Sequence, residues 1–169
     1  DDSSDQPESE LEDGMVVTLR GTVDSDGVTG TAEKVESEDE LQGQVESVFP
    51  AADPAYLVVL SQNVYVDDLT YYGNVSDLSG LVNGDYVEVH GQRDANGNIR
   101  ATRVEKLSGS PEIELKGVVS NLGATTFELW GLTVDFSSAV IEPSGATIAE
   151  GDLVEVEGTL SGDLVAIKV

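Results

Sequence analysis

The chain has 169 residues, among which 33 acids face only 8 lysines and arginines, giving a formal net charge of −25. A surface this acidic repels phosphate backbones and anionic membranes, and attracts cations and basic partners. The scattered basic residues also form no stripe of the kind that a nucleic-acid groove needs. Cysteine is absent, which excludes disulfides, thiolate metal sites and covalently attached haem. No apolar run approaches the roughly 18 residues that span a bilayer.

The chain begins with an acidic segment and continues into an alternating pattern. Residues 1–13, DDSSDQPESELED, show no strand pattern and have a composition typical of disorder, so we expect an acidic tail. Residues 14–38 alternate apolar and polar side chains on both sides of a DSDG turn, with Val17 and Leu19 before it and Val35 after it. This pattern predicts a β-hairpin with one face turned to a core.

The same hairpin pattern occurs twice more. Residues 84–106 read GDYVEVHGQRDANGNIRATRVEK, and residues 151–169 read GDLVEVEGTLSGDLVAIKV. Upstream of each lies a second shared stretch, ELQGQVESV from Glu40 and ELKGVVSNL from Glu114. Each repeat thus contains a strand with a central Gly, a second strand, a short strand ending in Asp, a loop and the hairpin. We place the two repeats at residues 39–108 and 109–169.

Five strands in about 60 to 70 residues, without helical periodicity, predict a small closed barrel. We expect the oligonucleotide-binding (OB) topology, with Gly43 and Gly117 at the bend that lets the first strand serve both sides of the barrel. A sandwich of the immunoglobulin type is the second choice, because it needs about seven strands per unit. The predicted fold is therefore all-β, with two tandem five-stranded OB-like barrels preceded by a hairpin from an incomplete repeat.

The two longer hairpin sequences resemble those of the tandem small β-barrel domains of unknown function found in bacterial envelope lipoproteins and secreted proteins. The resemblance covers most of residues 14–169. It implies an exported protein, extracellular or in the cell envelope, whose signal peptide has been removed. It implies no catalytic residues, because the shared motifs consist of turns and alternating strands.

The hairpin at 14–38 lacks the strands that precede the hairpin in each complete repeat. An isolated two-stranded ribbon is marginally stable in water, and its unpaired edges accept further strands. It could dock on the first repeat and extend its sheet, it could add to a neighbouring copy head-to-tail and build a ring or filament, or its partner strands could have been cut away. We expect head-to-tail self-association. The apolar residues that would carry it are Val16, Val17, Leu19, Val23, Val28 and Val35.

Several acidic turns are candidates for weak cation binding. The DSDG turn resembles the start of a calcium loop, but the residues after it do not supply the further ligands that end in a bidentate Glu. A hairpin turn is therefore the better interpretation, and we expect no cofactor beyond a weakly bound Ca²⁺. The candidate ligands are Asp24, Asp26, Asp53, Asp67 and Asp68.

Catalytic patterns are missing from the sequence. His90, the single histidine, occupies the repeat position of Arg20 and Glu157, so we expect it on the outward, solvated face of its strand. There is no nucleophile elbow, phosphate-binding loop or metal-binding histidine pair. Phe127 and Trp130 are expected in a core or an interface rather than in a base-stacking platform. We therefore predict a protein that is not an enzyme and binds no nucleic acid.

The function expected from the sequence is that of an exported structural or assembly protein. Its N-terminal segment would join copies by strand addition. The alternative is a monomeric cell-envelope module that binds cations, a basic protein or a glycan.

Overall fold

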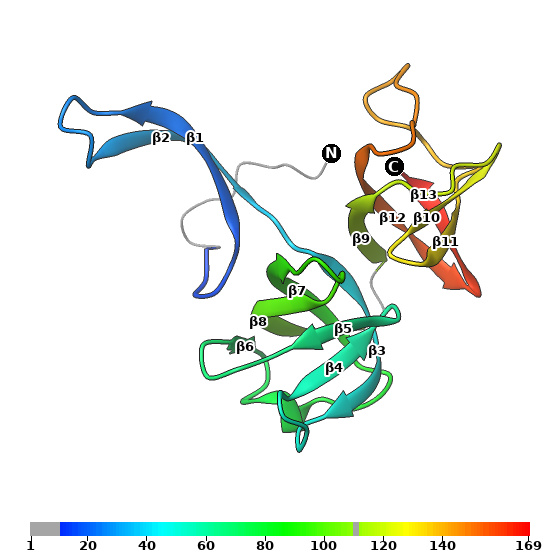
Figure 1. The fold of residues 1–169 in the computed structure, drawn as a ribbon. Helices are drawn as coiled ribbons and strands as arrows, with labels where there is room; N and C mark the ends of the chain where they lie inside the picture. Colours follow the sequence, from blue (N-terminus) through cyan, green and yellow to red (C-terminus); the bar gives the residue numbers. More distant parts are fainter. Residues whose placement is uncertain (1–10, 110–111) are drawn as a thin grey trace.

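The computed structural model describes residues 11–109 and 112–169, so most of the predicted acidic tail lies outside the described residues. Two barrels lie side by side and a two-stranded hairpin projects from them (Figure 1). The all-β prediction is confirmed, since the described helical structure is a single 3-10 turn, η2 (Leu78–Gly80). The strands are β1 (Val17–Val23), β2 (Gly30–Ser37), β3 (Leu41–Phe49), β4 (Tyr56–Val59), β5 (Gln62–Tyr65), β6 (Tyr71–Gly73), β7 (Tyr86–Arg93), β8 (Ile99–Leu107), β9 (Ile113–Val118), β10 (Thr126–Leu129), β11 (Leu132–Asp135), β12 (Leu153–Ser161) and β13 (Asp163–Lys168).

The first barrel closes through five strands. Going round it, β3 pairs with β4, β4 with β5, β5 with β8, β8 with β7, and β7 again with β3. All of these pairs are antiparallel except β5 and β8. Closure leaves no free sheet edge, which is how small barrels avoid unwanted pairing. A short sixth strand, β6, pairs in parallel with the far end of β8 and was not predicted.

Gly43 lies where β3 changes partners. Residues 41–44 pair with β7, and the strand then continues along β4 from Val45. A Cβ atom at position 43 would lie 2.8 Å from Cγ of Leu60, so a larger residue would displace that buried leucine. Gly43 thus lies two residues before the point where β3 passes from β7 to β4, at a position where close packing favours glycine.

The second barrel repeats this arrangement with a looser closure. Its path runs β10, β11, β13, β12, β9, and the pair of β11 with β13 is again parallel. The ends meet at one bridge between Ser120 and Glu128, whose backbone hydrogen bonds measure 3.0 and 2.7 Å. Where β6 lies in the first barrel, the second has an isolated parallel bridge from Val140 to Lys168.

The barrel interiors are filled by the apolar residues that alternate along the strands. Such a residue contributes about 1.5–3 kcal/mol when fully buried, which makes the interiors the main source of stability. Leu60 and Leu81 from loops and Leu78 from η2 complete the packing of the first interior. The most deeply buried side chains include Leu41, Leu57, Val64, Val87, Val89, Leu115, Phe127, Leu129, Val156 and Leu164.

The two barrels meet through a short continuation of the sheet. The start of β3 pairs with the start of β9, Leu41 opposite Leu115 and Gln42 opposite Glu114. Beside this contact, Trp130 Nε1 donates a hydrogen bond of 2.9 Å to the carbonyl oxygen of Lys116.

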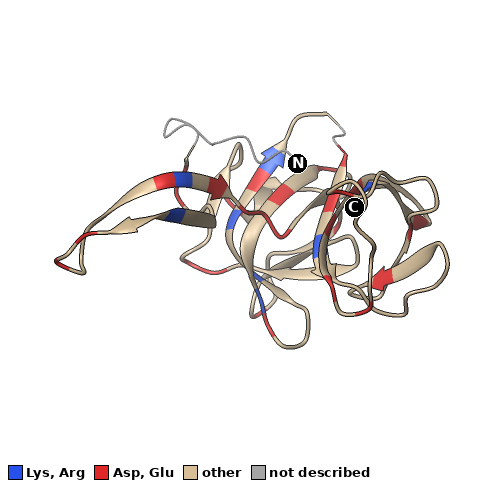
Figure 2. Ribbon diagram, turned by 90° about the horizontal axis from the view of Figure 1, so that it is seen from above, with Lys and Arg blue, Asp and Glu red and all other residues tan. Residues whose placement is uncertain are grey.

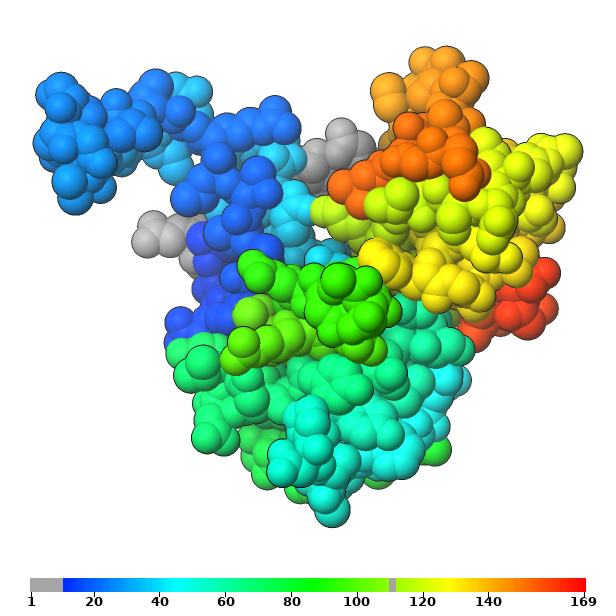
Figure 3. All heavy atoms as spheres, in the orientation of Figure 1, coloured from blue at the N-terminus to red at the C-terminus, as the bar shows by residue number. Residues whose placement is uncertain are grey.

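The hairpin β1–β2 forms a sheet of its own. Among the described residues its two strands pair only with each other, so the arrangement in which it extends the sheet of the first repeat is wrong for this chain. Its base is held by the segment before it, where Arg103 of β8 contacts the Glu12 carboxylate and donates a 3.1 Å hydrogen bond to the Asp13 carbonyl oxygen. The rest projects away from both barrels (Figures 1 and 3).

The three hairpins share an irregularity as well as a sequence pattern. Each first strand has a register shift immediately before a glycine, at Gly21, Gly91 and Gly158. A Cβ atom there would lie 2.1, 2.4 and 2.3 Å, respectively, from a backbone oxygen of the opposite strand. The glycine is therefore required at each bulge. The projecting hairpin thus has the local structure of the last two strands of a repeat.

Acidic residues are spread over both barrels and the tip of the projecting hairpin (Figure 2). None of the described residues belongs to a helix long and apolar enough to cross a membrane.

Candidate functional site

One face of the β1–β2 hairpin corresponds to the face that lines the barrel interior in the hairpins β7–β8 and β12–β13. Among the described residues, no further strands cover this face of β1–β2. The shared bulge aligns Leu19 with Val89 of β7 and Val156 of β12. Val89 and Val156 are fully buried, whereas Leu19 is 64% exposed. Among the residues expected to mediate association, Val17, Leu19, Val23 and Val28 are exposed and Val16 and Val35 are half-buried. The structure therefore presents an apolar ribbon to solvent.

The turn carboxylates of this hairpin support the turn itself. Asp26 Oδ1 accepts hydrogen bonds from the backbone N–H groups of Val28 and Thr29, at 2.9 and 3.0 Å. The Thr29 hydroxyl donates to both Asp24 and Asp26 at 2.9 Å. These bonds, led by those from the Thr29 and Val28 backbone, lower the pKa of Asp26. The structure brings Asp24 and Asp26 together, and it occupies their oxygens with donors of the turn.

The other three predicted cation ligands lie elsewhere. Asp53 is exposed in the β3–β4 loop, and Asp67 and Asp68 follow β5. Asp67 accepts hydrogen bonds from the Leu69 backbone at 2.8 Å and from Arg100 at 2.7 Å. Both interactions lower its pKa, the backbone bond more strongly. The five predicted ligands thus lie in three separate loops.

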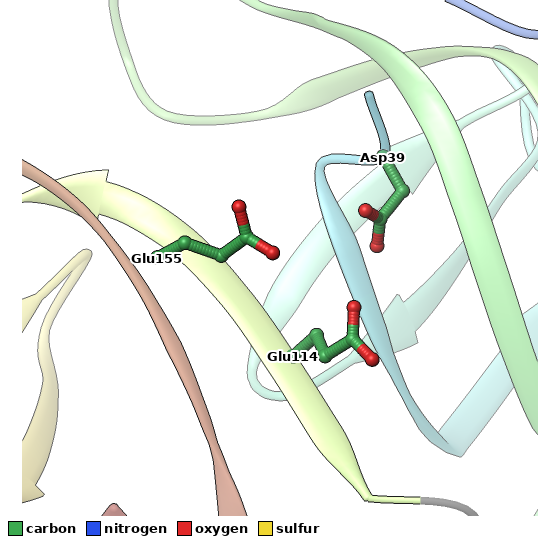
Figure 4. A group of neighbouring side chains, drawn as sticks. All are labelled: Asp39, Glu114 and Glu155. Atoms are coloured by element: carbon green, nitrogen blue, oxygen red, sulfur yellow. The ribbon is translucent and has the colours of Figure 1, made fainter. Parts of the chain in front are cut away.

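A different group of carboxylates converges where the hairpin and the two barrels meet (Figure 4). Asp39 comes from the segment between β2 and β3, Glu114 from β9 and Glu155 from β12. One oxygen from each lies within 4.8 Å of the others. The sequence did not predict this group, because its members are separated by more than 40 positions. Glu114 and Glu155 become neighbours when β9 pairs with β12, and Asp39 joins them when the two barrels pack. Such a set of oxygen ligands suits a hard cation.

The carboxylates in this junction repel one another. Burial, followed by the charges of Glu88 and Glu155, raises the pKa of Asp39 to about 6. Burial, followed by the charges of Asp39, Glu155, Glu157 and Glu88, raises that of Glu114 to about 8. Protonation or a bound cation would relieve this repulsion.

The repeat explains why Glu114 has no cationic partner among the residues that the structure describes. Its counterpart in the first repeat, Glu40, forms a 2.9 Å ion pair with Arg93 of β7. Alignment on the bulge glycine places Leu160 at the position of Arg93 in the second repeat. The acid is therefore repeated while the base that neutralises it is not, a signal that was visible in the sequence.

One cation does lie beside the group. Lys116 forms an ion pair with Glu38, which lowers the pKa of that acid through the hydrogen bond from the ammonium group. Lys116 is thus paired with Glu38 at the edge of the junction. Glu114 itself accepts a 3.2 Å hydrogen bond from Gln42 Nε2.

The prediction of a solvated His90 is wrong. The side chain is 1% exposed, because the bulge at His90 and Gly91 breaks the alternation and the segment after β2 covers the ring. Nδ1 lies 2.9 Å from the Glu38 carbonyl oxygen and Nε2 lies 2.8 Å from Glu88 Oε1. Both partners are acceptors, so the doubly protonated ring satisfies both. Burial lowers the pKa of His90, but the bonds to Glu88 and Glu38 outweigh it and raise the pKa overall.

The aromatic residues take structural places, as the sequence predicted. Phe127 is buried in the second barrel, and Trp130 lies between the barrels with the Arg93 guanidinium 4.5 Å from its ring centroid. This cation–π contact covers one face of the Trp130 ring.

Comparison with known proteins identifies the repeats. The family model of a domain of unknown function, DUF5666, matches residues 42–105 and again residues 116–169. No curated protein matches the chain. The two matched segments coincide with the two barrels and together make up well over half of the chain. This protein therefore belongs to the DUF5666 family and carries two copies of its domain.

Proposed function

We propose that this chain is a non-enzymatic structural module that assembles through its β1–β2 hairpin by strand addition. The observation that carries the proposal is an apolar hairpin face exposed to solvent beside two barrels that bury the same face. Val17 and Leu19 are 37 and 64% exposed, whereas their counterparts Val87 and Val89 in the first barrel are fully buried. Val23 and Val28, next to the turn, add further exposed apolar surface. Exposed apolar surface of this kind marks an interaction site, and unpaired strand edges supply backbone donors and acceptors for a partner.

The first partner to test is a second copy of the chain, in the head-to-tail contact expected from the sequence. The environment of His90, the single histidine, supports a non-catalytic role, because its ring is buried and both ring nitrogens are hydrogen-bonded. An extracellular or cell-envelope location is part of the proposal and rests on the resemblance of the hairpins to exported barrel domains. Fractionation of the native host would test it.

Oligomeric state measures the proposal directly. Light scattering of the wild-type chain over a concentration series should show growth in mass, and negative-stain microscopy should distinguish filaments from closed rings or dimers. The variant Leu19→Asp should remain monomeric, while the control Thr22→Asp, on the same strand beyond the bulge, should behave as the wild type. A wild-type chain that stays monomeric at high concentration and in high salt would refute self-association.

The second candidate function is cation binding at the junction of Asp39, Glu114 and Glu155. The observation that favours it is the convergence of three carboxylate oxygens within 4.8 Å of one another, where burial and mutual repulsion raise the pKa of Asp39 and Glu114. Calcium should raise the melting temperature of the wild type and should do so much less in Glu114→Gln. The control is Glu112→Gln, which alters an exposed acid two residues away. Equal calcium shifts in all three proteins would exclude this site.

A further inference from the structure

The strands that cover this type of hairpin are visible twice in the same molecule. In the first barrel β3 runs along β7, with Leu41 opposite Val89 and Gly43 opposite Val87. In the second barrel β9 runs along β12, with Leu115 opposite Val156 and Gly117 opposite Val154. The register is the same in both barrels. The leucine of the first strand lies opposite the residue two positions before the bulge glycine, and the glycine of the first strand lies opposite the residue four positions before it.

The second strand of each hairpin is covered in an equally regular way. β5 runs parallel to the start of β8, where Val64 lies opposite Ile99. β11 runs parallel to the start of β13, where Val134 lies opposite Leu164. The bulge alignment transfers both contacts to β1–β2. A first strand would place its leucine opposite Leu19 and its glycine opposite Val17, and a third strand would begin opposite Gly30.

We infer that the β1–β2 hairpin is a docking surface for the first three strands of another DUF5666 repeat, supplied by a polypeptide in which those strands lack a hairpin of their own. The inference rests on the proposed function in taking the hairpin as an association element, and it specifies the partner. Docking closes a third barrel around Val17, Leu19, Ala32 and Val35.

The partner is distinct from the described part of this chain. Both three-strand sets here, β3–β5 and β9–β11, already hold a hairpin through two-sided pairing. A second copy could offer one of these sets only by releasing its own hairpin, and the exchange would bury one apolar face while exposing an equivalent one. A set of three strands that has no hairpin of its own does not have to expose an apolar face in order to bind β1–β2. Binding also covers the apolar face of those three strands.

The test uses the full chain and a synthetic peptide of residues 112–136, which contains β9, β10 and β11. Calorimetric titration should show one peptide bound per chain, and amide hydrogen exchange should become slower at Val16–Leu19. The variant Leu19→Asp should bind at least tenfold more weakly, because a buried carboxylate replaces a barrel interior contact. The control Thr22→Asp should bind as the wild type does.

A second variant separates binding from the integrity of the hairpin. The peptide with Leu115→Asp leaves the chain unaltered and should also bind at least tenfold more weakly. Loss of binding by Leu19→Asp alone, with full binding of the altered peptide, would overturn the inferred register.

Light scattering without peptide distinguishes this inference from the proposed function. Self-association that depends on Leu19, with no peptide binding, would overturn the inference and leave the proposed function standing. Peptide binding to a chain that is otherwise monomeric would support the inference and overturn self-association. Absence of both would refute both.

Discussion

The hairpins β1–β2 and β7–β8 have the same local design and opposite surroundings. Both alternate apolar and polar residues, both turn at a Gly-containing loop, and both carry a bulge before a glycine, Gly21 or Gly91. In β7–β8 the apolar face is fully buried against β3 and β5, whereas in β1–β2 it is exposed. The comparison teaches that local sequence is sufficient to specify the hairpin, and that burial depends on strands supplied from elsewhere.

The largest expected difference between the two hairpins is the cost of a charge on the apolar face. Val89→Asp should unfold the first barrel or destabilise it by at least about 4 kcal/mol, because an unpaired carboxylate would be buried. Leu19→Asp at the equivalent position should change the free energy of barrel unfolding by less than about 0.5 kcal/mol. Thermal and urea unfolding, followed by the fluorescence of the single tryptophan and by circular dichroism, measure both. Equal losses would mean that β1–β2 is part of the barrel cooperative unit.

The bulge glycines Gly21 and Gly91 should also differ in how much barrel stability depends on them. Gly91→Ala would place a methyl group 2.4 Å from the Arg100 carbonyl oxygen and should cost about 1–3 kcal/mol. Gly21→Ala meets the Thr31 carbonyl oxygen at 2.1 Å, so it should open β1–β2 without lowering the barrel melting temperature. Amide exchange in β2 would report the opening. Unchanged exchange there would show that the ribbon tolerates the methyl group.

The residues just before these glycines also differ in environment. His90→Ala removes two hydrogen bonds from a buried ring and should destabilise the first barrel by about 2–4 kcal/mol. Arg20→Ala, at the matching position of β1, alters a largely exposed side chain and should stay within about 0.5 kcal/mol. Urea unfolding of both variants tests the difference, and a neutral His90→Ala would contradict a structural role for the ring.

The smallest expected effect concerns pH at the junction. The folded pKa of Glu114 is raised to about 8 from an ordinary value of 4.5, so between these pH values the folded chain holds a proton that the unfolded chain has lost. Stability should therefore fall as pH rises through this window, by a few degrees in melting temperature. Glu114→Gln should flatten the decline, whereas Glu40→Gln, at the equivalent position of the first repeat, should destabilise the chain by removing the carboxylate that pairs with the half-buried Arg93. A melting temperature of Glu114→Gln that still falls like the wild type would place the titration elsewhere.

The sequence predicted the hairpins and the repeat, because strand alternation and turn residues act over a few positions. It was wrong about His90, since the bulge interrupts the alternation on which the prediction relied and a linker from another repeat covers the ring. It placed weak cation ligands in turns, where the structure uses Asp24, Asp26 and Asp67 as turn acceptors. The acidic junction was not predicted, although Glu114 without a counterpart to Arg93 was a readable signal.

Which segments become strands, where they turn and which face of each is apolar follow from the local sequence, because these properties depend on neighbours two to four positions apart. Which apolar faces are covered and which acids are forced together follow from the packing of the whole chain. Those outcomes depend on contacts between residues far apart in the chain, such as Leu41 with Leu115 and Asp39 with Glu155, which form when barrels close and pack.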